Sequence, residues 1–120
     1  MSEDPITKIK SHTFYGRRYK FIYDEPKDIL SADDLAEIRK MSGLDEDTEI
    51  LGATDDNRVS EKMMIVSDKL EAENPKELLR VLLDEAWHAL DSTIDNTVVY
   101  EKAKDLCEFL WRCGYRRITS

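Results

Sequence analysis

The sequence predicts a small α+β domain in which an antiparallel sheet, made of two hairpins, packs against two long C-terminal helices. Residues 6–15 and 17–23 are rich in β-branched and aromatic side chains and flank Gly16, a pattern typical of a hairpin. Residues 75–91 and 95–114 carry apolar side chains at helical spacing. The 120 residues are 41% hydrophobic and 37% charged, which suits one globular domain with one core.

Between these segments the sequence predicts a third helix and a second hairpin. Ser31 begins a stretch that resembles a capping box, with Asp34 in place of the usual Glu, and Gly43 suits the end of that helix. Residues 49–54 and 61–67 are expected to form the two arms of the second hairpin, because turn-forming residues separate them.

The first long helix has a clear start, with Asn74 as its N-cap and Pro75 at its first position. Apolar side chains at helical spacing predict which sides of the two long helices meet each other and the sheet. The residues expected to be buried there are Leu82, Leu83, Ala86, Leu90, Leu106 and Leu110.

Composition and charge exclude several classes of function. Eighteen Lys and Arg against 26 Asp and Glu give a net charge of −8, which disfavours nucleic-acid binding. The longest apolar runs, such as residues 63–66, are far shorter than the roughly 20 residues of a membrane span. The N-terminus shows no secretory signal, so we expect a cytoplasmic protein without a membrane partner. Residues 1–120 are expected to form one domain, with flexible ends at residues 1–5 and 118–120.

One stretch of the first long helix carries the residues of a candidate active site. Asp84 and His88 are four residues apart, so both side chains leave the same side of the helix, and Glu85 lies one position further round. This is the spacing of the His-Glu-x-x-His motif, in which two histidines bind zinc and the glutamate is the general base. The simpler alternative is a solvated helix flank on which Asp84 and His88 form a pair.

The order of segments around this helix resembles small zincin-like proteins of phages and prophages, related to SprT-type and ImmA/IrrE-type metallopeptidases. The resemblance covers roughly residues 48–117. It rests on the strand KMMIVSDKL, the helix PKELLRVLLDEAWHALD and the closing helix AKDLCEFLWRCGYRR.

The resemblance implies a role for each residue of the candidate site. Glu85 stands at the position of the general base and His88 at that of the second metal ligand, whereas Asp84 replaces the first histidine. The family's acidic third ligand lies near the start of the closing helix, where only Asp95 could substitute. An Asp84-His88-Asp95 site could take zinc or another divalent metal, although the exchange of imidazole for carboxylate lowers selectivity for zinc.

Because the motif is degenerate, the first hypothesis is a zincin-like phage or prophage protein that binds no cofactor and acts, without catalysis, by binding a host or phage protein. The second is a metal-dependent hydrolase or peptidase in which Glu85 activates a metal-bound water. The third is an acidic inhibitor that occupies a basic site on a host protein. The candidate contacts to a partner are apolar at Trp111 and Tyr115, or acidic in the run Asp45-Glu46-Asp47.

Overall fold

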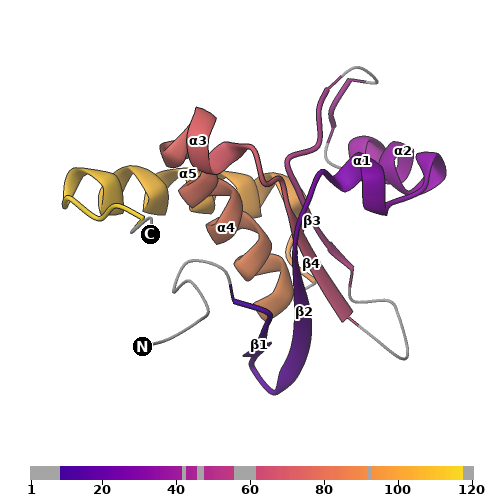
Figure 1. The fold of residues 1–120 in the computed structure, drawn as a ribbon, viewed down its shortest axis with the longest axis horizontal. Coiled ribbons are helices and arrows are strands. Elements are labelled where there is room, and N and C mark those ends of the chain that lie inside the picture. Colours follow the sequence, from indigo (N-terminus) through magenta and orange to yellow (C-terminus); the bar gives the residue numbers. More distant parts are fainter. Residues whose placement is uncertain (1–8, 42, 46–47, 56–61, 92, 118–120) are drawn as a thin grey trace.

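The computed structural model describes residues 9–41, 43–45, 48–55, 62–91 and 93–117. It is an α+β fold, with four strands followed by two long C-terminal helices (Figure 1). In chain order the elements are β1 (Ser11–Phe14), β2 (Arg17–Tyr23), α1 (Pro26–Ile29), α2 (Ala32–Met41), β3 (Gly52–Asp55), β4 (Lys62–Val66), α3 (Leu70–Glu73), α4 (Pro75–Leu90) and α5 (Asn96–Arg112).

The sheet has the strand order β1-β2-β4-β3 and is mixed. Both predicted hairpins are present, since β1 pairs antiparallel with β2 and β3 pairs antiparallel with β4. The two hairpins join through β2 and β4, which run parallel, with Tyr19 opposite Lys62 and Tyr23 opposite Val66. The prediction of a purely antiparallel sheet is therefore wrong at this one junction. Parallel neighbours need a long crossover, and here the chain makes it through α1, α2 and β3.

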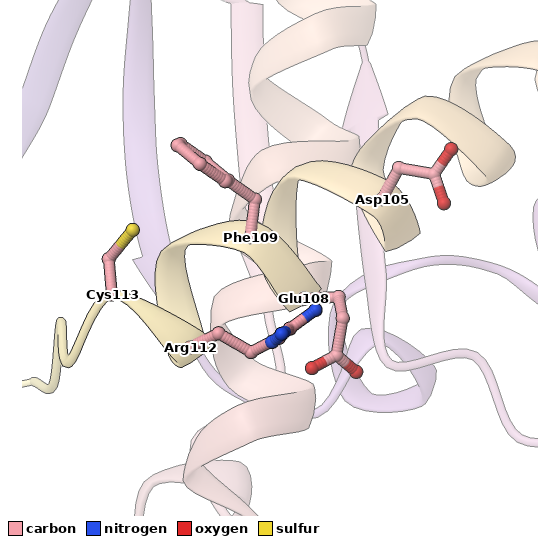
Figure 2. Close-up of a pocket in the computed structure, with 5 residues that line it drawn as sticks. All are labelled: Asp105, Glu108, Phe109, Arg112 and Cys113. Atoms are coloured by element: carbon pink, nitrogen blue, oxygen red, sulfur yellow. The ribbon is translucent and has the colours of Figure 1, made fainter.

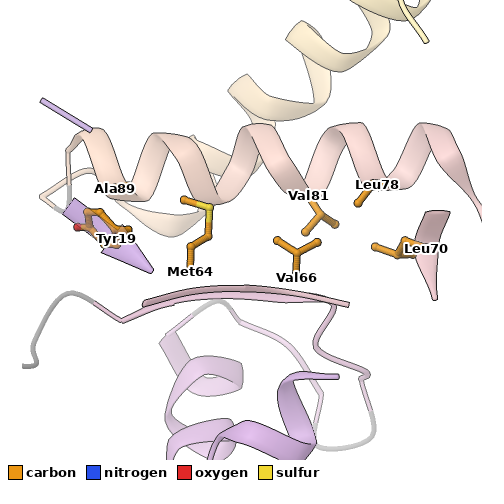
Figure 3. Close-up of a cluster of buried hydrophobic side chains, with 7 residues drawn as sticks. All are labelled: Tyr19, Met64, Val66, Leu70, Leu78, Val81 and Ala89. Carbon is orange, nitrogen blue, oxygen red and sulfur yellow. The ribbon is translucent and has the colours of Figure 1, made fainter. Parts of the chain in front are cut away.

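Strand β4 forms the core of the molecule, because α4 covers one of its faces and the α1–α2 region covers the other. Met64 and Val66 face α4, in a cluster that Figure 3 shows between that helix and the sheet. Ile65 points to the opposite face, where it packs with Leu30 and Leu35 from the α1–α2 region. A strand that is buried on both faces has a continuous run of apolar residues rather than alternating apolar and polar ones. Residues 63–66 form such a run.

The buried faces of the two long helices differ from the prediction. Leu90 and Leu106 are exposed, at 44% and 38%, and the other four predicted core residues are only half-buried. The buried residues are Leu78, Val81, Glu85 and Ala89 on α4, with Val99, Ala103 and Cys107 on α5. The reason is that α4 lies between the sheet and α5, so it has apolar side chains on several sides, and spacing alone does not identify the side that meets the sheet.

The helix starts and the first turn agree with the sequence analysis. The Asn74 side chain accepts a hydrogen bond from the Glu77 amide at 3.1 Å, which caps α4. In the β1–β2 turn, Tyr15 and Gly16 both have positive φ, as a type I′ hairpin turn requires. The short helices α1 and α3 were not predicted.

No helix within the described ranges is long and apolar enough to cross a membrane. The predicted flexible ends, residues 1–5 and 118–120, lie outside the described residues.

Candidate functional site

Asp84 and His88 lie one turn apart on a flank of α4, and the structure brings them together as the spacing predicts. His88 Nε2 lies 3.1 Å from Asp84 Oδ1, and Arg80 Nη1 donates to Asp84 Oδ2 at 3.2 Å. Both carboxylate oxygens of Asp84 therefore have a partner on α4 itself. The three side chains are 14–21% exposed, so solvent screens this network only partly.

Glu85 points in a different direction, into the layer between α4 and the sheet. Its side chain is on the buried face of the helix, with only 7% of the residue exposed. The Thr54 hydroxyl donates to Glu85 Oε1 at 2.7 Å, which ties the carboxyl group to strand β3.

Gly52 makes room for this carboxyl group. A Cβ atom added at Gly52 would lie 3.1 Å from both Cγ and Oε2 of Glu85, and 2.6 Å from Val81 Cγ1. A glycine within a strand often marks such a close approach by another group. The β3 backbone and α4 thus enclose the Glu85 carboxyl group from two sides.

This enclosure changes the acidity of Glu85. Burial in the helix–sheet layer raises the pKa of the Glu85 carboxyl to about 7, and the negative charge of Asp84 acts in the same direction. His88, the Thr54 hydroxyl and Arg80 oppose the rise, more weakly. The folded chain therefore favours the protonated form of Glu85 more than an exposed glutamate would.

Asp95, the third predicted metal ligand, caps a helix instead. Asp95 is the N-cap of α5, where its carboxylate accepts a hydrogen bond from the Thr97 amide at 2.8 Å. In the described part of the chain, no three His, Cys, Asp or Glu residues are grouped so that they could hold a metal ion. The structure thus joins Asp84 and His88, directs Glu85 toward strand β3, and uses Asp95 to start the next helix.

The residues predicted to contact a partner differ in their exposure. Trp111 is half-buried, and the Arg116 guanidinium stacks 3.5 Å from its ring centroid. Tyr115 is 65% exposed and Asp45 is exposed, whereas residues 46–47 lie outside the described residues. Sequence reasoning missed Phe109, which is 62% exposed on α5. Phe109 does not share the helical spacing of Val99, Ala103 and Cys107, and this difference could have indicated that it is exposed.

The chain matches no model of a known protein family, and neither a curated protein nor a solved structure gives a significant match. The resemblance to zincin-like metallopeptidases stays a prediction from the sequence motifs.

Proposed function

We propose that this chain is a zincin-like domain that has lost its catalytic site and acts by binding another protein. The observation that carries the proposal is the Arg80–Asp84–His88 network. At the position of the first metal ligand, Asp84 already has Arg80 at one oxygen and His88 at the other. A metal ion would have to displace both contacts and leave the Arg80 guanidinium nearby as a repelling positive charge.

The general-base position supports the same proposal. Glu85 accepts a hydrogen bond from Thr54 and is buried against β3, so its carboxyl group belongs to the contact between helix and sheet. A catalytic base must reach a water or substrate proton within hydrogen-bond distance. In this arrangement the carboxyl group serves the packing of α4 on the sheet.

A metal-dependent hydrolase is the second candidate, and one observation favours it. Burial raises the pKa of Glu85 to about 7, which is suitable for general-base catalysis near neutral pH. The candidate would need Asp84 to leave Arg80 and a further ligand to join His88. Zinc or another divalent metal would then supply the activated water.

The binding partner we propose is a host or phage protein in the cytoplasm of the host cell. Tyr115 is the exposed apolar anchor at the C-terminal end, and aromatic anchors dominate the energy of many protein interfaces. The acidic-inhibitor alternative would instead use the Asp45-Glu46-Asp47 run and depend on long-range charge.

Capture from a host lysate at low and high salt tests this proposal. We expect a partner that is retained at high salt and lost on Tyr115→Ala, because an apolar anchor is insensitive to screening. Tyr15→Ala is the matched control, since Tyr15 is an 88% exposed tyrosine at the far end of the β1–β2 hairpin. Capture that requires low salt and is abolished by Asp45→Asn, Glu46→Gln and Asp47→Asn together would support the acidic inhibitor instead. Absence of any captured protein would contradict both binding hypotheses.

A further inference from the structure

The C-terminal end of α5 and the segment after it form a basic region on an acidic chain. Residues 106–117 contain one acidic residue, Glu108, and three arginines, so their charges sum to +2, whereas the whole chain has a net charge of −8. We define the C-terminal basic surface by Arg112, Tyr115 and Arg116, which are all exposed. Screening limits the reach of exposed charges to about 8–10 Å at physiological salt, so a partner at this surface experiences the local charge.

Two acidic residues in contact with this region are already paired. Lys76 Nζ lies 2.9 Å from Glu108 Oε1, and Figure 2 shows the Arg112 side chain beside the same glutamate. One carboxylate therefore interacts with two cations. Arg117 Nε lies 3.5 Å from Glu71 Oε2, and the Arg117 side chain is only 14% exposed. After this pairing, the region still has an excess of positive charge.

Arg116 is held in place by groups that carry no negative charge. Its guanidinium carbon lies 3.5 Å from the centroid of the Trp111 ring, and Nη1 donates to the carbonyl oxygens of Trp111 and Tyr115, each at 2.9 Å. Nε and Nη2 carry three more N–H donors, and none of the described residues accepts a hydrogen bond from them. A guanidinium fixed in this way is suited to a two-point contact with a carboxylate, because little further side-chain freedom is lost on binding.

Exposed aromatic side chains are interleaved with the two exposed arginines. Tyr115 is 65% exposed and Phe109 is 62% exposed. A surface depression lies in the C-terminal half of α5, and Figure 2 shows the Phe109 ring projecting from the helix there. The residues that line the depression are Asp105, Glu108, Phe109, Arg112 and Cys113. Rings and arginines together are complementary to a segment that has acidic residues next to an apolar one.

We propose that the C-terminal basic surface binds an acidic segment of the protein partner, in which a glutamate or aspartate pairs with Arg116 and a neighbouring apolar side chain packs on Tyr115. This inference rests on the proposed function and adds the chemistry of the partner. Tyr115 supplies the anchor, and the arginines select acidic residues beside it. The partner surface is thus acidic, which is the opposite of what the acidic-inhibitor alternative requires.

A nucleic acid is also negatively charged, but two observations favour an acidic protein segment. A long polyanion extends past the basic surface and meets the rest of a chain whose net charge is −8. Arg116 also covers one face of the Trp111 ring, on which a base could otherwise stack.

A fluorescently labelled peptide with the sequence Glu-Glu-Leu-Phe-Glu-Glu, titrated with the full chain, tests the proposal through its fluorescence polarisation. We expect saturable binding with a Kd below about 1 mM. Replacing every glutamate of the peptide with glutamine should weaken binding at least about tenfold, because the charge-assisted hydrogen bonds are lost.

Variants of the chain locate the contact. Arg116→Glu and Tyr115→Ala should each weaken binding of the glutamate peptide at least about tenfold. Arg116→Glu should instead prefer a peptide with lysine in place of glutamate, and Arg116→Lys should retain only part of the affinity, because an ammonium group lacks the planar fork. Lys102→Glu is the matched control, since it makes the same change in charge at an exposed position about 15 Å before Arg112 along α5.

Absence of saturable peptide binding up to about 1 mM of chain overturns the proposal. Equal weakening by Arg116→Glu and Lys102→Glu also overturns it, because net charge alone would then explain binding. Tighter binding of a single-stranded ten-nucleotide oligothymidylate than of the glutamate peptide would overturn it in favour of a nucleic acid.

Capture from the host lysate separates this inference from the proposed function. A captured partner whose binding Arg116→Glu does not weaken contradicts the acidic segment and leaves the proposed function standing. Peptide binding that depends on Arg116, without any captured partner, supports the basic surface and contradicts the proposed function.

Discussion

Glu85 is an ionisable group inside a packing layer, held there by two residues of β3 that are distant in sequence. Thr54 supplies a hydrogen bond to the carboxyl group, and Gly52 supplies the space for it. A buried carboxyl group is tolerated when it is hydrogen-bonded and can take up a proton, and the raised pKa of Glu85 shows that the folded chain favours the neutral form.

The first prediction concerns the pH dependence of stability. The folded pKa of Glu85 is about 7 and thus lies above its ordinary value of 4.5, so folding favours the protonated form. Its contribution to stability is fully present below about pH 4.5 and is lost as the pH rises through 7. Glu85→Gln removes this loss, so its stability relative to the parent should increase by roughly 3 kcal/mol between about pH 4 and pH 8.

Denaturant melts across this pH range measure the effect. The charges of Asp84, His88 and Arg80 act on Glu85, so the measurement is made in the parent background with those residues intact. Glu101→Gln, at an exposed glutamate on α5, is the matched control for the change of carboxylate to amide. A Glu85→Gln difference that is constant with pH would show that the fold does not hold the carboxyl group in its neutral form.

The second prediction concerns the close approach at Gly52. Gly52→Ala places a methyl group 2.6 Å from Val81 Cγ1, inside the contact distance of two carbon atoms, so one of the two elements must move. We expect a loss of about 1–3 kcal/mol in the free energy of unfolding. In a Val81→Ala background the same substitution should cost less, because the clashing methyl group is gone. An equal loss of stability on Gly52→Ala in both backgrounds would show that contact with Val81 is not the cause of the strain.

Helix α4 packs against two elements, the sheet on one side and α5 on another. This arrangement separates leucines that look equivalent in sequence. Leu78 is 1% exposed against the sheet, whereas Leu90 near the C-terminal end of the same helix is 44% exposed.

The third prediction uses these two leucines as a matched pair. Leu78→Ala should lower the free energy of unfolding by about 2–5 kcal/mol, because it leaves a cavity in a packed cluster. Leu90→Ala should cost less than about 1 kcal/mol, as exposed substitutions usually do. Urea melts of both variants measure the two free energies of unfolding. Similar losses for Leu78→Ala and Leu90→Ala would mean that the sheet-facing side of α4 is assigned wrongly.

The limits of sequence reasoning follow from the same helix. Its start is predictable because Asn74 and Pro75 act locally, and the Asp84–His88 pair is predictable because the partners are four residues apart. The side of α4 that faces the sheet is not predictable, because it contains Glu85, and glutamate is usually exposed to solvent. Thr54, 31 residues away, supplies a hydrogen bond to that buried carboxyl group, and Gly52 leaves the space for it.

The sheet shows the same division between local and distant causes. The extent of β2 follows from its own aromatic and β-branched residues, and Gly16 predicts the turn before it. The pairing of β2 with β4 depends on the route of the chain through α1 and α2, which no local pattern encodes. Each hairpin is therefore predictable, whereas the parallel junction between them is not.

In the molecule as a whole, the polar residues of the candidate site take part in contacts within and between the helices and the sheet. Arg80 holds Asp84 on α4, Glu85 joins α4 to β3, and Asp95 begins α5. We propose that these groups stabilise the fold and that the chain acts through its surfaces.

The zinc content of the purified chain distinguishes this proposal from the metal-dependent alternative. The parent chain, purified without chelator, should contain well under one zinc per chain, and EDTA should leave its melting temperature unchanged. A metal bound only by the folded state would shift that temperature by several degrees through mass action. His12 on β1 provides the control for the only other histidine. Stoichiometric zinc that is lost on His88→Ala and kept on His12→Ala would contradict the account and establish the metal-dependent alternative.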